Sequence, residues 1–112
     1  REGWFVGLGD VDAAGMAETE RLCGTGFAYS HVFDVRDRAA WDMALSAFAT
    51  AAGGRIDVLA NNAGVPLGGP LSDNTPDEIE RCLDINLKGV LWGAQAVLPW
   101  LRQTAPGSAL VN

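Results

Sequence analysis

Two consecutive asparagines, a small residue and a glycine follow an apolar run in the segment IDVLANNAGVP, residues 56–66. Ala63 and Gly64 let the backbone approach a ligand closely, because neither carries a bulky side chain. The side-chain amides of Asn61 and Asn62 can hold such a loop open by bridging it to its neighbours. A plain strand-to-loop turn is the alternative, because Asn and Gly are common turn formers.

Two carboxylates follow other apolar runs of the chain. Asp10 ends the run WFVGLGD, residues 4–10, and can accept hydrogen bonds from both ribose hydroxyls of an adenosine. The same charge repels a 2′-phosphate, so Asp10 favours NAD over NADP. Asp34 can accept from an adenine amino group while Val35 packs on the ring. The alternatives are a helix-capping acid for Asp10 and an ordinary strand end for Asp34.

The elements that must position these residues alternate along the chain. Apolar runs predict strands at 4–10, 27–35, 55–61 and 108–112, and amphipathic segments predict helices at 12–24, 36–54 and 76–103. Thr75, Pro76 and Glu78 form a capping-box signature at the start of the last helix. Continuously apolar strands that alternate with helices predict a doubly wound parallel α/β sheet. Ligands bind such sheets outside the carboxyl ends of the strands, where Asp10, Asp34 and Asn61 fall.

The composition excludes several function classes. The chain has 112 residues, 48% of them hydrophobic, and a net charge of −6. Nucleic acids and anionic membranes require clustered basic residues, which this balance disfavours. No apolar run is long enough to span a bilayer. Cys23 and Cys82 lack metal-ligand spacing, so we expect no metal site and a reduced, cytoplasmic protein, with a disulfide as the open alternative.

The chain resembles the short-chain dehydrogenase/reductase family over nearly its whole length. The resemblance rests on IDVLANNAG (56–64), GDVD (9–12), the Asp34-Val35 pair and DINLKG (84–89). It implies a Rossmann-type domain of an NAD(P)-dependent oxidoreductase that interconverts an alcohol and a ketone by hydride transfer. The substrate it implies is a small molecule whose identity these residues do not specify.

The resemblance also implies roles for individual residues. Asp10 binds the adenosine ribose and Val11 lies beside the adenine, which Asp34 and Val35 hold. The ribose side of the cofactor is lined by Asn61, Ala63 and Gly64. The catalytic contribution comes from Asn86, which holds a water in the proton relay at a helix carbonyl freed from its ladder. The alternative for Asn86 is an amide buried at a helix–helix contact.

Helix 76–103 corresponds to a helix through which members of the family associate. Gly89 and Gly93 allow close helix approach, and we therefore predict a homo-oligomer, a dimer or a tetramer. The structural alternative is that the apolar residues of this helix belong to the core of the chain itself.

Other parts of the family pattern are missing from residues 1–112. The chain contains no Gly-rich phosphate loop and no Tyr-x-x-x-Lys pair; its one tyrosine, Tyr29, and its one lysine, Lys88, are far apart. We therefore expect a part of a single Rossmann domain, truncated at both ends, inactive and poorly folded by itself. The alternatives to an enzyme are a non-catalytic dinucleotide-binding or regulatory protein and an inactive remnant.

Overall fold

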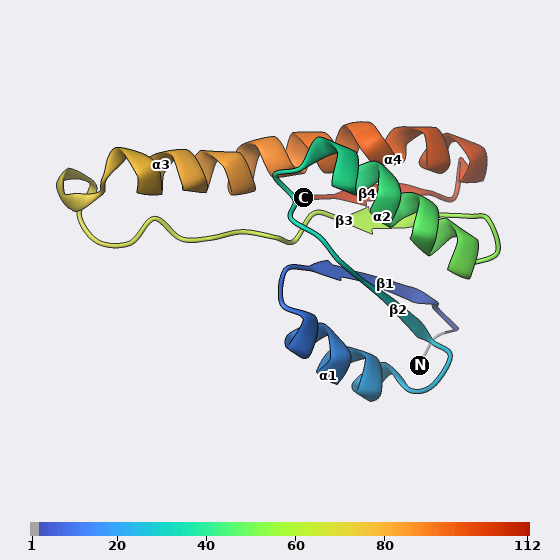
Figure 1. Ribbon diagram of the computed structural model, residues 1–112. Coiled ribbons are helices and arrows are strands. Elements are labelled where there is room, and N and C mark those ends of the chain that lie inside the picture. The colour runs from blue at the N-terminus through green and yellow to red at the C-terminus, as the bar shows by residue number, and fades with distance from the viewer. Residues whose placement is uncertain (1–2) are drawn as a thin grey trace.

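The predicted alternation of strands and helices is confirmed by a computed structural model that describes residues 3–112 (Figure 1). In chain order the elements are β1 (Val6–Asp10), α1 (Ala13–Cys23), β2 (Ala28–Val32), α2 (Arg38–Ala51), β3 (Val58–Ala60), the 3₁₀ turn η1 (Leu71–Asp73), α3 (Pro76–Leu83), the π-helix η2 (Asp84–Gly89), α4 (Val90–Thr104) and β4 (Ala109–Val111). Most elements are shorter than predicted because turns and caps take up their ends.

The strands form two parallel pairs. β1 pairs with β2, with Val6 opposite Ala28, and β3 pairs with β4, with Leu59 opposite Leu110. Helix α1 lies on one side of the β1–β2 pair and α2 on the other (Figure 1). Parallel strands covered by helices on both faces confirm the doubly wound class, and the sheet consists of two separate halves.

A cavity of about 800 Å³ separates the two halves of the sheet. Its walls include the whole of β1 on one side and the whole of β3 on the other. Among the described residues neither strand has a hydrogen-bonded neighbour on the edge that faces the cavity. The halves are connected instead through α2, which packs against both β2 and α4.

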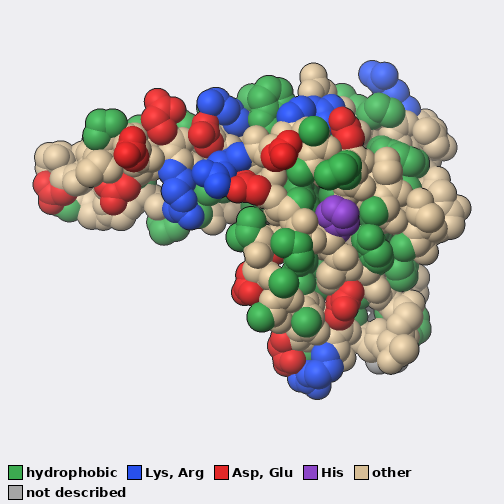
Figure 2. All heavy atoms as spheres, viewed as in Figure 1, with side chains coloured by type: hydrophobic (Ala, Val, Ile, Leu, Met, Phe, Trp, Pro, Cys, Tyr) green, Lys and Arg blue, Asp and Glu red, His purple; other side chains and the backbone are tan. Residues whose placement is uncertain are grey.

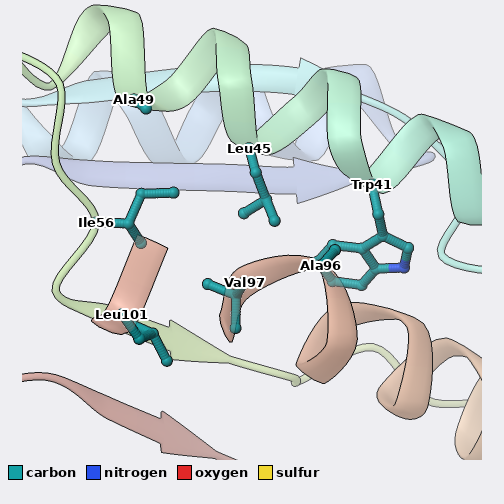
Figure 3. Packing of buried hydrophobic residues seen from close by; sticks show 7 residues of the cluster. All are labelled: Trp41, Leu45, Ala49, Ile56, Ala96, Val97 and Leu101. Carbon is teal, nitrogen blue, oxygen red and sulfur yellow. The ribbon is translucent and has the colours of Figure 1, made fainter. Parts of the chain in front are cut away.

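The core forms where α2 crosses α4 above β3 (Figure 3). Trp41, Leu45 and Ala49 project from α2 at intervals of four residues, which places them on one helix face. They pack against Val97, which has no exposed surface, and against Ile56, Ala96 and Leu101. The apolar face of α2 therefore packs against α4, which in turn contacts β3.

The predicted helix 76–103 is capped as expected but is not uniform. The Thr75 side chain accepts from the Glu78 N–H while the Glu78 carboxylate accepts from the Thr75 N–H, and Pro76 is the first helical residue. The difference lies at residues 84–89, where hydrogen bonds run from i to i+5. One continuous helix thus has a π-helical segment in its middle, and Asn86 lies within that segment.

One further expectation is wrong, and the ground for another does not hold. Asp34 and Val35 do not end a strand, because β2 stops at Val32 and the Asp37 N–H donates to the Asp34 carbonyl to form a turn. Gly89 and Gly93 are buried against this chain itself, not on an exposed face. A β-carbon at Gly89 would lie 2.9 Å from the Val35 side chain. The glycines therefore allow close packing within the chain and do not support an oligomer.

Candidate functional site

The predicted site residues lie beyond the carboxyl ends of the strands. Asp10, Val35, Asn61, Ala63 and Gly64 all line the cavity between the two halves of the sheet. Three predicted residues lie outside the cavity lining, namely Val11, Asp34 and Asn86. The fold thus brings residues from three separate chain segments to one edge, as parallel strands require.

Asp10 ends β1 with its carboxylate fixed on one side. Its Oδ1 accepts from the Asp12 N–H at 3.0 Å, and Asp12 in turn caps α1 through the N–H groups of Ala14 and Gly15. Asp12, and not Asp10, is therefore the residue that caps α1. Within residues 3–112 no hydrogen bond reaches Oδ2 of Asp10, which leaves that oxygen available to a hydroxyl. Val11 follows with an exposed fraction of 66%.

Asp34 is held by its neighbour Arg36. The Arg36 backbone N–H donates to Oδ1 at 2.9 Å, and the guanidinium Nη2 donates to Oδ2 at 2.6 Å. Hydrogen bonds from Arg36 are the main reason that the pKa of Asp34 lies below its ordinary value, and Arg81 contributes a weaker Coulombic effect. Asp34 is therefore an ionised acceptor with its orientation set locally.

Val35 is fixed by packing from two directions. The indole Nε1–H of Trp41 donates to the Val35 carbonyl at 3.0 Å, and the valine side chain packs against Gly89 of the π-helical segment. Val35 is consequently linked to α2 and to the helix that bears Asn86.

Asn61 connects three elements at the end of β3. Its Nδ2 donates to the Val90 carbonyl at 3.3 Å and to Oδ1 of Asn112 at 2.9 Å, while its backbone N–H pairs with Val111. Its buried Oδ1 has no hydrogen-bond partner among the described residues and lies against Gly93. The side chain thus joins β3 to β4 and α4, and its contact with a cofactor stays a prediction.

Asn86 binds the loop that follows the NNAG segment. Its Oδ1 accepts from the Val65 N–H at 2.8 Å and its Nδ2 donates to the Val65 carbonyl at 2.8 Å. Nδ2 also lies 3.4 Å from the Sγ of Cys82. The side chain is therefore not buried between helices but holds the loop backbone directly after Gly64.

The sequence did not indicate three of these partners, namely Arg36, Trp41 and Val65, and it predicted an oligomer contact for the fourth, Gly89. The contact of Arg36 could have been predicted from the sequence, because a residue two positions after an Asp can meet its carboxylate in a local turn. Trp41 and Val65 make contacts whose partners depend on how α2 and the π-helical segment pack, and no local pattern indicates them.

The residues present fit an adenosine-containing dinucleotide better than a metal ion. The exposed Asp10 carboxylate has a free oxygen and lines the cavity together with the small residues Ala63 and Gly64, whereas the ionised Asp34 lies outside that lining. Within residues 3–112 no three His, Cys, Asp or Glu side chains gather as metal ligands. In the same range no helix is long and apolar enough to cross a bilayer, and Cys23 and Cys82 are both free thiols. A cytoplasmic location stays a prediction.

Comparison with known proteins identifies the family. The family model for short chain dehydrogenases matches residues 1–112. The chain belongs to the short-chain dehydrogenase family. Among curated members, the 3-alpha-(or 20-beta)-hydroxysteroid dehydrogenase of Mycobacterium tuberculosis is 37% identical over 110 residues, which cover 97% of this chain and 41% of that protein. The curated relatives of this short-chain dehydrogenase chain are matched over 19% to 43% of their own lengths.

Solved structures of family members superpose on this short-chain dehydrogenase chain. A 3-ketoacyl-(acyl-carrier-protein) reductase from Brucella melitensis, complexed with NADH, matches with a TM-score of 0.83 and 26% identity, over 89% of this chain and 41% of that one. The closed form of a serine dehydrogenase complexed with NADP⁺ matches with a TM-score of 0.81 and 31% identity, over 92% of this chain and 41% of that one. The neighbours therefore include complexes with both dinucleotides.

Proposed function

We propose that this chain is the adenosine-binding part of an NAD-dependent oxidoreductase that interconverts a small-molecule alcohol and ketone. The observation that carries the proposal is the edge at which Asp10, Val35 and the Ala63–Gly64 backbone line one cavity. Each of these residues comes from a different strand–helix unit. The family membership of the chain supports a redox enzyme over a non-catalytic dinucleotide-binding protein.

The proposed contacts follow from the donors and acceptors present. Asp10 Oδ2 accepts from a ribose hydroxyl, and the negative charge repels a 2′-phosphate, so NAD binds in preference to NADP. Asp34 accepts from the adenine amino group while Val35 packs on the ring. Ala63 and Gly64 offer backbone and little side chain, which allows the ribose to pass close to them.

The bound dinucleotide supplies hydride acceptance and donation. Within this chain, Asn86 fixes the loop after Gly64 through Val65, and the surrounding π-helical segment shifts the backbone hydrogen-bond ladder. We infer that a carbonyl released by this shift orients a relay water. The groups that transfer the proton are absent from residues 1–112, so in this proposal they belong to the rest of a larger domain.

The same proposal explains the divided sheet. The free edges of β1 and β3 face each other across a cavity lined by their backbones. One further parallel strand in this space would pair with both edges and cover the exposed Trp4 side chain. The chain is then one part of a single Rossmann domain, and not an independent unit.

Calorimetric titration of the complete gene product with NAD and NADP tests the proposal. We expect NAD to bind at least about tenfold more tightly than NADP, and Asp10→Ala to remove most of that difference because the repulsion is lost. Asp42→Ala removes an exposed carboxylate from α2 and leaves the ratio unchanged. Absence of dinucleotide binding overturns the function. Binding without turnover of any alcohol or ketone favours the non-catalytic alternative.

We also propose a homo-oligomer, and this proposal rests on exposed leucines, not on Gly89 and Gly93. Leu83, Leu87 and Leu91 follow one another at four-residue intervals along the long helix and are each about half exposed. Such a row is a surface that a second copy can cover. Light scattering of the complete gene product should show a multimer that Leu87→Glu dissociates, whereas Leu22→Glu on α1 has no effect. A monomeric wild type overturns this part.

A further inference from the structure

The carboxylate proposed to recognise adenine is already bound by Arg36. Oδ1 of Asp34 accepts from the backbone N–H of Arg36 at 2.9 Å, and Arg36 Nε lies 3.0 Å from both carboxylate oxygens. Nη2 of Arg36 completes a two-pronged contact at 2.6 Å from Oδ2. Nε carries a single hydrogen that both oxygens share, so Arg36 directs three N–H groups at a carboxylate that offers about four lone-pair positions.

The contact is nevertheless open to exchange. The Asp34 and Arg36 side chains retain 35% and 45% of their exposed surface, and exposed ion pairs are weak. Figure 2 shows basic and acidic side chains intermingled where the long helix joins the body of the molecule. Arg81 acts on Asp34 and Asp84 on Arg36 through their charges, so each member of the pair also interacts with a second charge of opposite sign.

We propose that Arg36 is an internal competitor for Asp34 and thereby determines how strictly the nucleotide site selects its base. The inference rests on the proposed function, because it assumes that a dinucleotide binds with its base at Asp34. An adenine amino group is a donor, so it competes with the guanidinium N–H groups of Arg36 for the same two oxygens. Binding of adenine therefore costs part of the Arg36–Asp34 contact.

The same guanidinium gives a different base an advantage. Hypoxanthine carries a carbonyl where adenine carries the amino group, so it presents an acceptor that a bare carboxylate repels. A displaced Arg36 guanidinium can donate to that carbonyl. Arg36 consequently weakens the preference for adenine from both directions: it competes with the correct donor and accommodates the wrong acceptor.

The test compares NAD with nicotinamide hypoxanthine dinucleotide by calorimetric titration of the complete gene product. We expect Arg36→Ala to tighten NAD binding about two- to fivefold, the range that loss of one exposed ion pair allows. The same variant should bind the hypoxanthine dinucleotide more weakly. The dissociation constant of the hypoxanthine dinucleotide divided by that of NAD should therefore rise by about tenfold. Arg36→Lys keeps the positive charge but lacks the planar guanidinium group. Its ratio of dissociation constants should lie between those of wild type and Arg36→Ala.

Arg21→Ala is the matched control. Arg21 forms a two-pronged contact with Glu18 on α1, at 2.8 and 2.7 Å, away from the strand ends. Its removal should leave both dissociation constants unchanged. Salt provides a second readout, since raising sodium chloride weakens the internal pair and should narrow the difference in NAD affinity between wild type and Arg36→Ala.

The outcomes separate the inference from the function on which it depends. Failure of the wild type to bind either dinucleotide overturns the proposed function and the inference with it. Binding of NAD that is unchanged or weakened in Arg36→Ala overturns the inference alone, because Arg36 is then neutral or supports adenine recognition. A thermal melt of each folded variant, matched to wild type, ensures that these constants refer to native protein.

Discussion

The side-chain amide of Asn86 pairs with both backbone hydrogen-bonding groups of Val65, each at 2.8 Å. Val65 precedes Pro66, and a residue before proline favours extended backbone, in which the N–H and C=O of one residue point to the same side. The pair thus connects the π-helical segment to the loop that follows β3. It is the only contact of its kind that the described residues show between these two segments.

Replacing Asn86 should loosen this loop without unfolding the chain. Asn86→Ala removes two hydrogen bonds of about 1 kcal/mol each, so the Val65 amide hydrogen should exchange with solvent about tenfold faster or more. Asn74→Ala is the control, because Asn74 bonds to Gly68 in the same loop and not to Val65. Equal exchange rates at Val65 in wild type and Asn86→Ala would show that other contacts hold the loop.

Adding one methyl group at Gly93 should destabilise the fold. A β-carbon there collides with Oδ1 of Asn61 and lies 2.8 Å from the Trp41 ring, so α4 must move away from β3. We expect Gly93→Ala to lower the free energy of unfolding by about 1–3 kcal/mol in chemical denaturation of the complete gene product. Gly68→Ala, where no atom lies within 4 Å, is the matched control and should have little effect.

The capping box should make α3 sensitive to both mutation and acid. Thr75→Ala removes a cap worth about 1 kcal/mol, whereas Thr75→Ser retains it. Hydrogen bonds from Thr75 hold the pKa of Glu78 below its ordinary value of 4.5. A lowered folded pKa means that this contribution is complete above 4.5 and is lost as pH falls through the folded value.

Nuclear magnetic resonance measures both effects on α3. We expect its amide protection to decrease in Thr75→Ala at neutral pH, and in wild type only at pH below 4.5. Protection of α3 that is independent of acid in the wild type, down to pH 2, would contradict the assigned role of Glu78.

The 112-residue chain alone should not unfold cooperatively. The edges of β1 and β3 lack strand partners on the cavity side, and exposed edges with apolar side chains such as Trp4 promote association. We expect a broad thermal transition whose midpoint depends on protein concentration. The complete gene product is the comparison and should melt sharply. A sharp, concentration-independent melt of the 112-residue chain would show that the divided sheet is stable as it stands.

The sequence by itself determined the features that depend on a few adjacent residues. The cap at Thr75 is confirmed, as is the amphipathic character of helix α2, because capping bonds and helical periodicity act within one or two turns. The NNAG segment also indicated the family correctly. The sequence placed the end of β2 too late, at residue 35, because the Asp34 side chain bonds within its own turn and the strand pairing ends before it.

Only the tertiary structure decided the contacts between distant segments. Asn86 meets Val65 across 21 positions, and Gly93 lies under Asn61 because α4 packs onto β3. The glycines that the sequence made candidates for an oligomer contact are buried within the chain for the same reason. Such contacts depend on how whole helices pack against the sheet, and the local sequence pattern around each residue does not specify that packing.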